Sequence, residues 1–321
     1  MTMGPMSKIL FVASPGVDDA AALRQAVEFA DNNQAQLTVV GVIKDVEKSV
    51  GTRRYKPKTL LHDMMQQQQV ELAELVSSIA APESAIEVKV LVGKPFLQII
   101  REVLRNHYDL VVKSAESIAS ISLIFGSTDL NLLRNCPCPL WIIKSTEQKG
   151  YREIVAAVDY DFEDPNVDQL NGRILGLAAA VALADFSEMH VVHAWRLLHE
   201  DFLRSAHVGI DNNEVDAMAE LEQNRRRQWL EKLVADHCAS QGEGATDYLQ
   251  PKIHLPKGDA SSAVPALANE IGAELIVMGT VGRTGIPGFF IGNTAETILN
   301  QIDCSVLTVK PHGFVSPVTE S

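Results

Sequence analysis

Short apolar runs alternate along the chain with longer segments in which apolar residues recur every three or four positions. Lys8 to Ser14 and Leu37 to Ile43 are almost continuously apolar, which is typical of strands in a parallel sheet covered on both faces. Pro95 to Asn106 has helical periodicity, with proline at its first turn. Strands that alternate with helices predict a mostly parallel open sheet with right-handed crossovers.

The first half contains one complete set of these elements. We expect five strands, separated by helices over about 19–31, 58–79 and 95–106 and by a helix after Gly126. Ser145 to Gly150 then has the polar, small-residue composition of a linker. The expected strands cover residues 8–14, 37–43, 86–92, 110–113 and 140–144.

The same order of elements begins again after the linker. Ile154 to Asp159 matches the first strand, Met189 to Trp195 matches the second, and Lys252 to Lys257, which ends at Gly258, matches the third. At the end of each half, CPLWIIK (138–144) lies over CSVLTVK (304–310), an offset of 166 residues. Two copies of one α/β domain explain this most simply, so we predict domains at 1–146 and 151–312 and a flexible tail at 313–321.

A glycine-rich loop stands between a strand and a helix near the end of the chain. The apolar run Leu275 to Met278 stops at Gly279, and Asn293 to Gln301 again has helical spacing. Glycines at such a place let main-chain N–H groups approach an anion without a Cβ in the way. This loop is our candidate ligand site, and its glycines are Gly279, Gly282, Gly285, Gly288 and Gly292.

Composition and charge narrow the class of protein. Hydrophobic residues make up 46% of the chain, enough for two cores, yet no apolar run approaches the roughly 20 residues of a membrane-spanning helix. Residues 1–146 hold 15 basic and 15 acidic residues, so the whole net charge of −13 lies in the remainder. We expect no nucleic-acid binding and no membrane association. The N-terminus lacks the layout of a signal peptide, which favours a soluble protein of the cytoplasm.

The four cysteines and nine histidines do not form a recognisable metal motif. Cys136 and Cys138 are too close for the usual CxxC arrangement and are expected to pack as small hydrophobic residues. His190 and His193 are three positions apart on a strand and therefore point to opposite faces. No metal site is predicted, although a zinc site assembled from distant residues stays open.

The duplicated pattern resembles the universal stress protein family. The pattern begins with an early aspartate after the first strand. After the fourth strand it continues with G-x-x-G, nine residues and then G-polar-T. In this chain the two glycine motifs are Gly279 to Gly282 and Gly292-Asn293-Thr294. With both halves in one chain, the protein looks like the tandem E-type members of that family. The resemblance implies two tandem five-stranded domains of the adenine-nucleotide alpha-hydrolase-like, Rossmann-like type.

The resemblance also implies a ligand and its site. In nucleotide-binding relatives the glycine-loop positions cradle phosphates, the position of Asp159 lies near the ribose or a phosphate-bound metal, and the backbone at Ala194 meets adenine. It implies ATP or AMP, with Mg²⁺ if the ligand is ATP. Arg283 follows the second glycine and is a candidate to reach a phosphate. The candidate residues are Asp159, Ala194, Gly279, Thr280, Gly282, Arg283, Gly292, Asn293 and Thr294.

Two departures from the family pattern bear on that ligand. The ATP-binding pattern usually has serine or threonine where this chain has Asn293, which donates a hydrogen bond but is larger. In the first half, Lys113 and Glu116 replace the first two glycines, and only Gly126 is retained. A carboxylate there would repel phosphate. We therefore predict that only the second half binds nucleotide.

Other interpretations remain open at the same residues. Asn293 and Glu296 also fit a helix-capping variant, and Asp159 also fits a residue that ends a strand. The protein is alternatively a nucleotide-independent scaffold or small-ligand carrier.

No catalytic set is present, so any enzymatic activity is limited to slow ATP hydrolysis or self-phosphorylation at a hydroxyl such as Thr294. The last strand of each half would leave an edge exposed. In the family that the chain resembles, this strand pairs between protomers. The resemblance therefore implies that the two halves pair antiparallel as an internal pseudo-dimer, with protein partners or a further homodimer beyond it.

Overall fold

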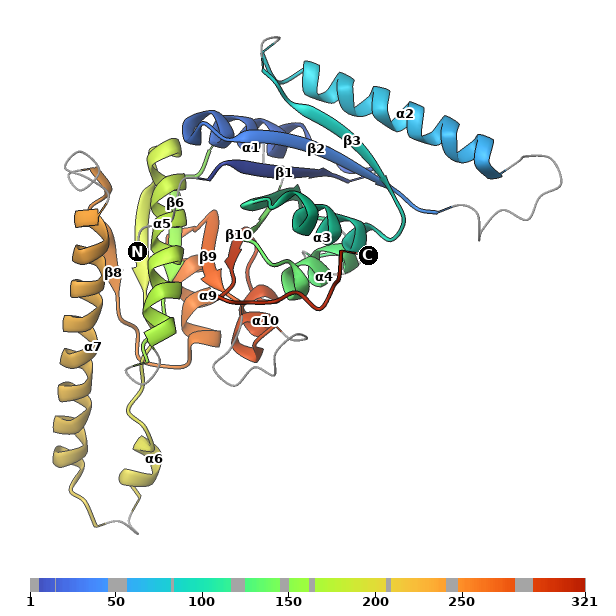
Figure 1. Cartoon of the computed structure of the whole chain (residues 1–321). Helices are drawn as coiled ribbons and strands as arrows, with labels where there is room; N and C mark the ends of the chain where they lie inside the picture. Colours follow the sequence, from blue (N-terminus) through green and yellow to red (C-terminus); the bar gives the residue numbers. More distant parts are fainter. Residues whose placement is uncertain are drawn as a thin grey trace. The chain divides into compact units, whose positions relative to one another are not determined.

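The chain forms two compact α/β units (Figure 1). The computed structural model describes residues 6–14, 16–45, 57–81, 84–116, 125–144, 150–161, 165–205, 209–240, 248–280 and 291–320. The larger unit comprises Gly4–Gly150, Thr280–Gly292 and Asp303–Ser321, and the smaller comprises mainly Tyr151–Gly279 and Asn293–Ile302. The units do not follow the predicted repeats throughout, because the end of the second repeat packs with the first. The predicted domain boundaries therefore remain a proposal about sequence repeats.

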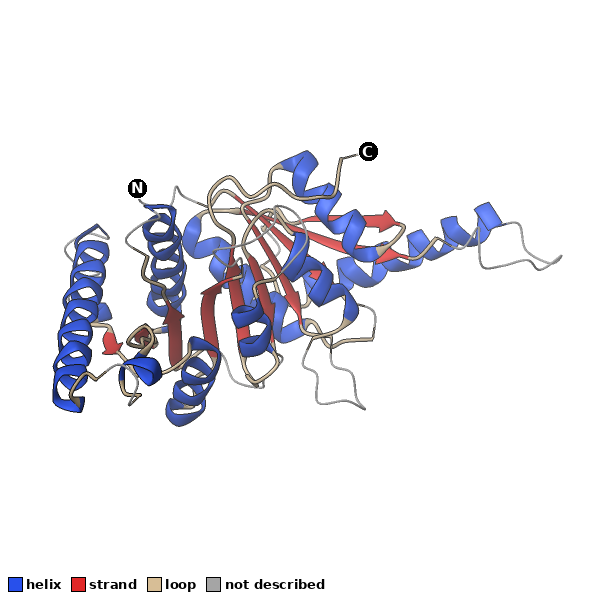
Figure 2. Cartoon of the chain, turned by 90° about the horizontal axis from the view of Figure 1, so that it is seen from below, coloured by secondary structure: helices blue, strands red, loops and turns tan. Residues whose placement is uncertain are grey.

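The larger unit is a sheet of six strands in the order β3-β2-β1-β4-β5-β10. Its first five strands are parallel to one another, and helices pack against them (Figure 2). The elements are β1 (Lys8–Ala13), α1 (Ala20–Asn33), β2 (Gln36–Ile43), α2 (Pro57–Ser77), β3 (Glu87–Val92), α3 (Pro95–Asn106), β4 (Leu110–Ser114), α4 (Ser127–Asn135), β5 (Leu140–Ile143) and β10 (Ser305–Val309).

The strands of the larger unit are its core, as their continuous apolar character predicts. From its second residue onward β1 is buried, and β4 and β5 are buried throughout. Trp141 on β5 and Phe29 on α1 form a T-shaped contact, with a centroid separation of 5.4 Å. Burial on both faces explains why these strands read as apolar runs rather than as alternating patterns.

The antiparallel pairing predicted for the two last strands is confirmed. β10 pairs with β5 in the register Val306 to Ile142, Leu307 to Trp141 and Thr308 to Leu140. The pair buries two edges that would otherwise offer unpaired N–H and C=O groups. Lys144 also forms an ion pair with Asp303, and its main-chain N–H donates to Ser305 Oγ at 3.0 Å.

The smaller unit repeats the parallel arrangement with strands in the order β9-β6-β7-β8. This order matches β4-β1-β2-β3 of the larger unit, as a duplication requires. The long helix α7 is the yellow-brown helix of Figure 1. The elements are β6 (Glu153–Ala157), α5 (Pro165–Asp185), β7 (Glu188–Val192), α6 (Glu200–Leu203), α7 (Asn212–Ser240), β8 (Lys252–His254), α9 (Ala260–Ile271), β9 (Leu275–Gly279) and α10 (Asn293–Leu299).

A matching glycine turn supports the duplication at the level of the backbone. Gly93 follows β3 with φ of 138°, and Gly258 holds the corresponding place before α9 with φ of 146°. Side chains rarely tolerate this conformation, so each repeat needs glycine where the chain turns from its third strand into a helix.

Two strands are shorter than the sequence predicts. β7 ends at Val192 rather than Trp195, and β8 ends at His254 rather than Lys257. The pairing continues only as an isolated bridge between Trp195 and Lys257. Pro256 lies within this stretch and has no N–H to donate, which explains the interrupted ladder.

The C-terminal residues make contacts that the flexible-tail prediction did not anticipate. Arg101 Nε donates to the Thr319 carbonyl at 3.2 Å, and Ser316 Oγ donates to the Asn135 carbonyl at 2.7 Å. Polar composition alone carries no information on such long-range hydrogen bonds. No helix in the described part of the chain combines the length and hydropathy needed to cross a membrane.

Candidate functional site

Three strands of the smaller unit end at one edge of its sheet. β6 is parallel to both of its neighbours, with β7 on one side and β9 on the other, so the strand order reverses at β6. Open α/β sheets bind ligands at the carboxyl ends of strands beside such a reversal. Gly279 is the last residue of β9, Asp159 follows β6 by two residues, and Ala194 follows β7 by two. The structure thus brings three predicted site residues to the same edge.

The main chain at Asp159 is held by a side chain that the sequence did not single out. Asn171 of α5 accepts the Asp159 N–H at 3.1 Å and donates to the Asp159 carbonyl at 2.6 Å. Asn171 is buried, whereas Asp159 is exposed. Two hydrogen bonds from one buried amide fix the backbone, so the Asp159 side chain starts from a defined position at the sheet edge.

The residues next to Asp159 and Ala194 in the sequence, Tyr160 and His193, belong to an aromatic cluster. Tyr160 and His193 both pack against Trp229 of α7, with ring centroids 4.9 Å and 5.1 Å from it. His193 Nδ1 lies 3.3 Å from the Val158 carbonyl, which ties the two strand ends together. This aromatic cluster of Tyr160, His193 and Trp229 was missed in the sequence, because Trp229 is far from the strands along the chain.

Gly279 has a packing role of its own. A Cβ at this position would lie 3.0 Å from Leu170 Cδ2 of α5, closer than ordinary contact. The glycine therefore allows α5 to approach the end of β9, whether or not a ligand is bound. This role stands beside the predicted anion-binding role and does not exclude it.

Thr280 is fully buried and bonded to a lysine. Its hydroxyl lies 2.7 Å from Lys310 Nζ, which also donates to the Leu133 carbonyl at 2.6 Å. Burial lowers the pKa of Lys310 to about 8. The side chain of Thr280 thus serves the packing of the larger unit. Lys310 was not a candidate in the sequence, where it is simply the last residue of a strand motif.

The glycine loop itself is described only at its two ends. Gly282 and Arg283 lie outside the described residues. The Gly292 N–H donates to the Thr280 carbonyl at 2.8 Å, which closes the loop at its base. α10 begins at Asn293, so the capping position that the alternative interpretation gave to Asn293 belongs to Gly292. Asn293 and Thr294 form the first turn of this helix.

The matching place in the first repeat is filled by side chains of the chain itself. Lys113 and Asp129 form an ion pair in which neither side chain is exposed. Asp129 Oδ2 accepts the N–H groups of Glu116 at 2.9 Å and of Gly126 at 3.1 Å. The main-chain N–H of Thr128, in the first turn of α4, donates to Glu116 Oε2 at 3.4 Å. Two carboxylates therefore accept main-chain donors of the kind that a phosphate would need.

The repeated strand order and the loop after the fourth strand of each repeat define a tandem Rossmann-like α/β protein. The chain belongs to the universal stress protein family, whose model matches residues 6–144 and 150–310. It is similar to universal stress protein E of Photorhabdus laumondii, at 27% identity over 324 residues and 98% of each chain. It is also similar to universal stress protein E of Escherichia coli strain K12, at 28% identity over 321 residues and 98% of each. The resemblance to tandem E-type members is confirmed.

A solved structure supports the fold independently. The crystal structure of a functionally unknown protein from Pseudomonas aeruginosa superposes with a TM-score of 0.67 at 23% sequence identity. The match covers 95% of this chain and 93% of that one. At this identity the likeness shows the fold alone.

Proposed function

We propose that the second repeat binds ATP or AMP at the carboxyl edge of β6, β7 and β9. The observation that carries this proposal is the convergence of Asp159, Ala194 and Gly279 at the point where the strand order reverses. In this site the exposed carboxylate of Asp159 would accept hydrogen bonds from ribose hydroxyls or hold a phosphate-bound Mg²⁺. The backbone at Ala194 would meet adenine.

The phosphates would lie over the glycine loop. Main-chain N–H groups at the start of α10, around Thr294, suit an anion, and Gly282 and Arg283 complete the predicted loop. Ala295 occupies the place that Asp129 holds in the first repeat, and a methyl group accepts no hydrogen bond. This chemical difference supports the assignment of nucleotide to the second repeat.

We propose that the first repeat binds no nucleotide and acts as a structural partner. Its Lys113–Asp129 pair and the Glu116 carboxylate occupy the corresponding cradle. An incoming phosphate would have to displace two negative charges and leave Lys113 without its partner. Both requirements oppose binding.

Occupancy of the second repeat would then act on protein partners in the cytoplasm, as part of a stress response. Regulation through binding needs no catalytic residue, and neither unit presents a positioned nucleophile and base among the candidates described above. Slow hydrolysis or self-phosphorylation at Thr294 ranks below this role.

Calorimetric titration of the full chain with ATP and Mg²⁺ tests the proposal. We expect one nucleotide per chain. Asp159→Ala should weaken binding about tenfold or more, as expected for the loss of one charge-assisted contact, while the matched Asp168→Ala on the exposed face of α5 should leave it unchanged. Two nucleotides per chain would contradict the assignment to the second repeat. Absence of binding at millimolar ATP, with ADP, AMP and cyclic nucleotides also silent, would favour the scaffold or carrier function instead.

A further inference from the structure

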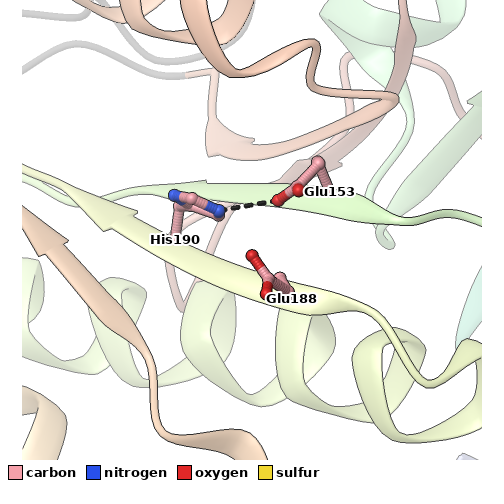
Figure 3. A group of neighbouring side chains, drawn as sticks. All are labelled: Glu153, Glu188 and His190. Carbon is pink, nitrogen blue, oxygen red and sulfur yellow. Dashed lines mark hydrogen bonds and ion pairs between the residues drawn. The ribbon is translucent and has the colours of Figure 1, made fainter.

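Two glutamates and a histidine meet at the opposite edge of the smaller unit's sheet (Figure 3). Glu153 and Glu188 are the first residues of β6 and β7 and are direct partners in the strand register. His190 lies two residues after Glu188 and so projects from the same face of β7. β6 has five residues, which separates this edge from the proposed nucleotide site by about 15 Å.

The three side chains converge to within the span of a single ion. His190 Nε2 lies 2.7 Å from Glu153 Oε2, and the three potential ligand atoms all lie within 4.8 Å of one another. Figure 3 shows the Glu188 carboxylate pointing toward the His190–Glu153 pair. The relative exposures of the side chains are 4% for His190, 28% for Glu153 and 58% for Glu188. The group is therefore anchored in the interior at His190 and open to solvent at Glu188.

A second histidine is placed to orient the first. His254 of β8 stacks on His190 with 5.0 Å between ring centroids, and its Nε2 lies 2.8 Å from His190 Nδ1. If His190 binds a metal through Nε2, its remaining proton is on Nδ1 and is donated to His254. Histidine ligands of metals characteristically have such an acceptor on the second nitrogen, which fixes the ring and its tautomer.

We propose that Glu153, Glu188 and His190 bind a divalent transition-metal ion of the zinc class, with water at the remaining position. One imidazole nitrogen and two carboxylate oxygens form a ligand set that zinc accepts in tetrahedral geometry. The ion replaces the hydrogen bond between His190 and Glu153. Small rotations of the two glutamates bring their oxygens to coordination distance.

A lysine competes with the ion for one of its ligands. Lys252 of β8 forms an ion pair with Glu188, and both side chains are more than half exposed. Loss of an exposed ion pair lowers the stability of the fold only slightly. Replacing Lys252 would also free Glu188 for the metal and remove a positive charge from the site. The proposal therefore predicts opposite effects for two substitutions at neighbouring exposed positions.

Calorimetric titration of the full chain with ZnCl₂ tests the site, and Co²⁺ absorption in the visible range reports the geometry. We expect one Zn²⁺ per chain and intense d–d bands with Co²⁺. Glu188→Gln should weaken Zn²⁺ binding at least about tenfold, and His254→Gln about 10- to 100-fold. Lys252→Met should tighten binding about two- to fivefold. Glu231→Gln, an exposed carboxylate on α7, is the matched control and should have no effect.

Circular dichroism and thermal melting of each variant separate loss of the site from loss of the fold. Glu188 and Lys252 are exposed, so both variants are expected to fold as the unsubstituted chain does. The proposal is overturned if Zn²⁺ does not bind to the full chain, or if Glu188→Gln and Lys252→Met leave its affinity unchanged.

Discussion

The two repeats have different residues at the turn that leads from the fourth strand into the next helix. In the first repeat the main-chain N–H groups around Gly126 donate to two carboxylates, those of Asp129 and Glu116, and Asp129 also forms a fully buried ion pair with Lys113. In the second repeat Gly279 stands where Lys113 does and Ala295 stands where Asp129 does. At these two positions the second repeat therefore has neither a lysine nor a carboxylate.

The difference shows that few substitutions separate a turn whose main-chain donors bond to internal carboxylates from one with glycine and alanine at the corresponding positions. A carboxylate from the helix and one from the strand end satisfy the same donors that an external phosphate would satisfy. A buried ion pair adds little net stability, because desolvation offsets its attraction, but it is costly to break once present. Replacing one member of the Lys113–Asp129 pair in the first repeat should therefore be costly.

The largest expected effect is on the buried pair of the first repeat. Lys113→Met leaves Asp129 charged and unpaired in the interior, so the free energy of unfolding should fall by about 3 to 5 kcal/mol. The double variant Lys113→Met/Asp129→Asn removes both charges but keeps an acceptor for the N–H groups of Glu116 and Gly126, so it should recover most of that loss. Urea denaturation measures both values. Equal losses in the single and double variants would show that the pair is not coupled.

Introducing the first repeat's carboxylate into the second should abolish nucleotide binding. Two unit charges 4 Å apart interact by about 4 kcal/mol at an effective dielectric constant of 20. Ala295→Asp should therefore weaken ATP binding by more than about 100-fold. Ala295→Asn has the same shape without the charge and should stay within about tenfold of the original chain. If both variants bind equally, charge does not distinguish the two cradles.

The two glycines should differ in their tolerance of a methyl group. A Cβ at Gly126 would lie 2.2 Å from Glu116 Oε2 and 2.6 Å from Glu116 Cβ, whereas at Gly279 the nearest atom is Leu170 Cδ2 at 3.0 Å. Gly126→Ala should cost about 1 to 3 kcal/mol of stability because Glu116 has to move. Gly279→Ala should cost less, because a leucine methyl can shift. Thermal denaturation of the two variants side by side gives the comparison.

The smallest expected effect concerns Lys310, which bonds to the start of the second loop. Its pKa of about 8 in the folded protein lies below the ordinary value of 10.5, so the unfolded chain binds more protons at intermediate pH. Its contribution to stability therefore rises with pH through that window, by about 1 to 2 kcal/mol between pH 7.5 and 9.5. Urea denaturation of the original chain and of Lys310→Met at both pH values isolates this contribution. An identical pH dependence in the two proteins would refute it.

Local patterns were sufficient to predict most of the fold. α3 was placed at its observed bounds, because Pro95 marks its first turn and its apolar spacing is regular. The pairing of β5 with β10 was predicted from the family resemblance, applied to two apolar strands that each end a repeat. The strand ends near Trp195 and Lys257 were misplaced, because the effect of Pro256 depends on which strand lies beside it.

The candidate nucleotide site could be predicted only in part. The family resemblance supplied Asp159, Ala194 and Gly279, and they share an edge because the parallel strands before them end together at a reversal of the strand order. Asn171, which fixes the Asp159 backbone, lies on α5, and Trp229, on which Tyr160 and His193 pack, lies on α7. No local pattern encodes the packing angles of these two helices.

By itself the sequence determined the duplication, the alternation of strands and helices, and the loss of two loop glycines in the first repeat, because each of these is a property of neighbouring residues. Only the tertiary structure decided that Asp129 pairs with Lys113, that Lys310 holds Thr280, and that His190 meets Glu153 and His254. The physical reason is strand register and helix packing. These bring together side chains that are 16 to 64 residues apart along the chain. No periodic pattern in the sequence predicts contacts at that separation.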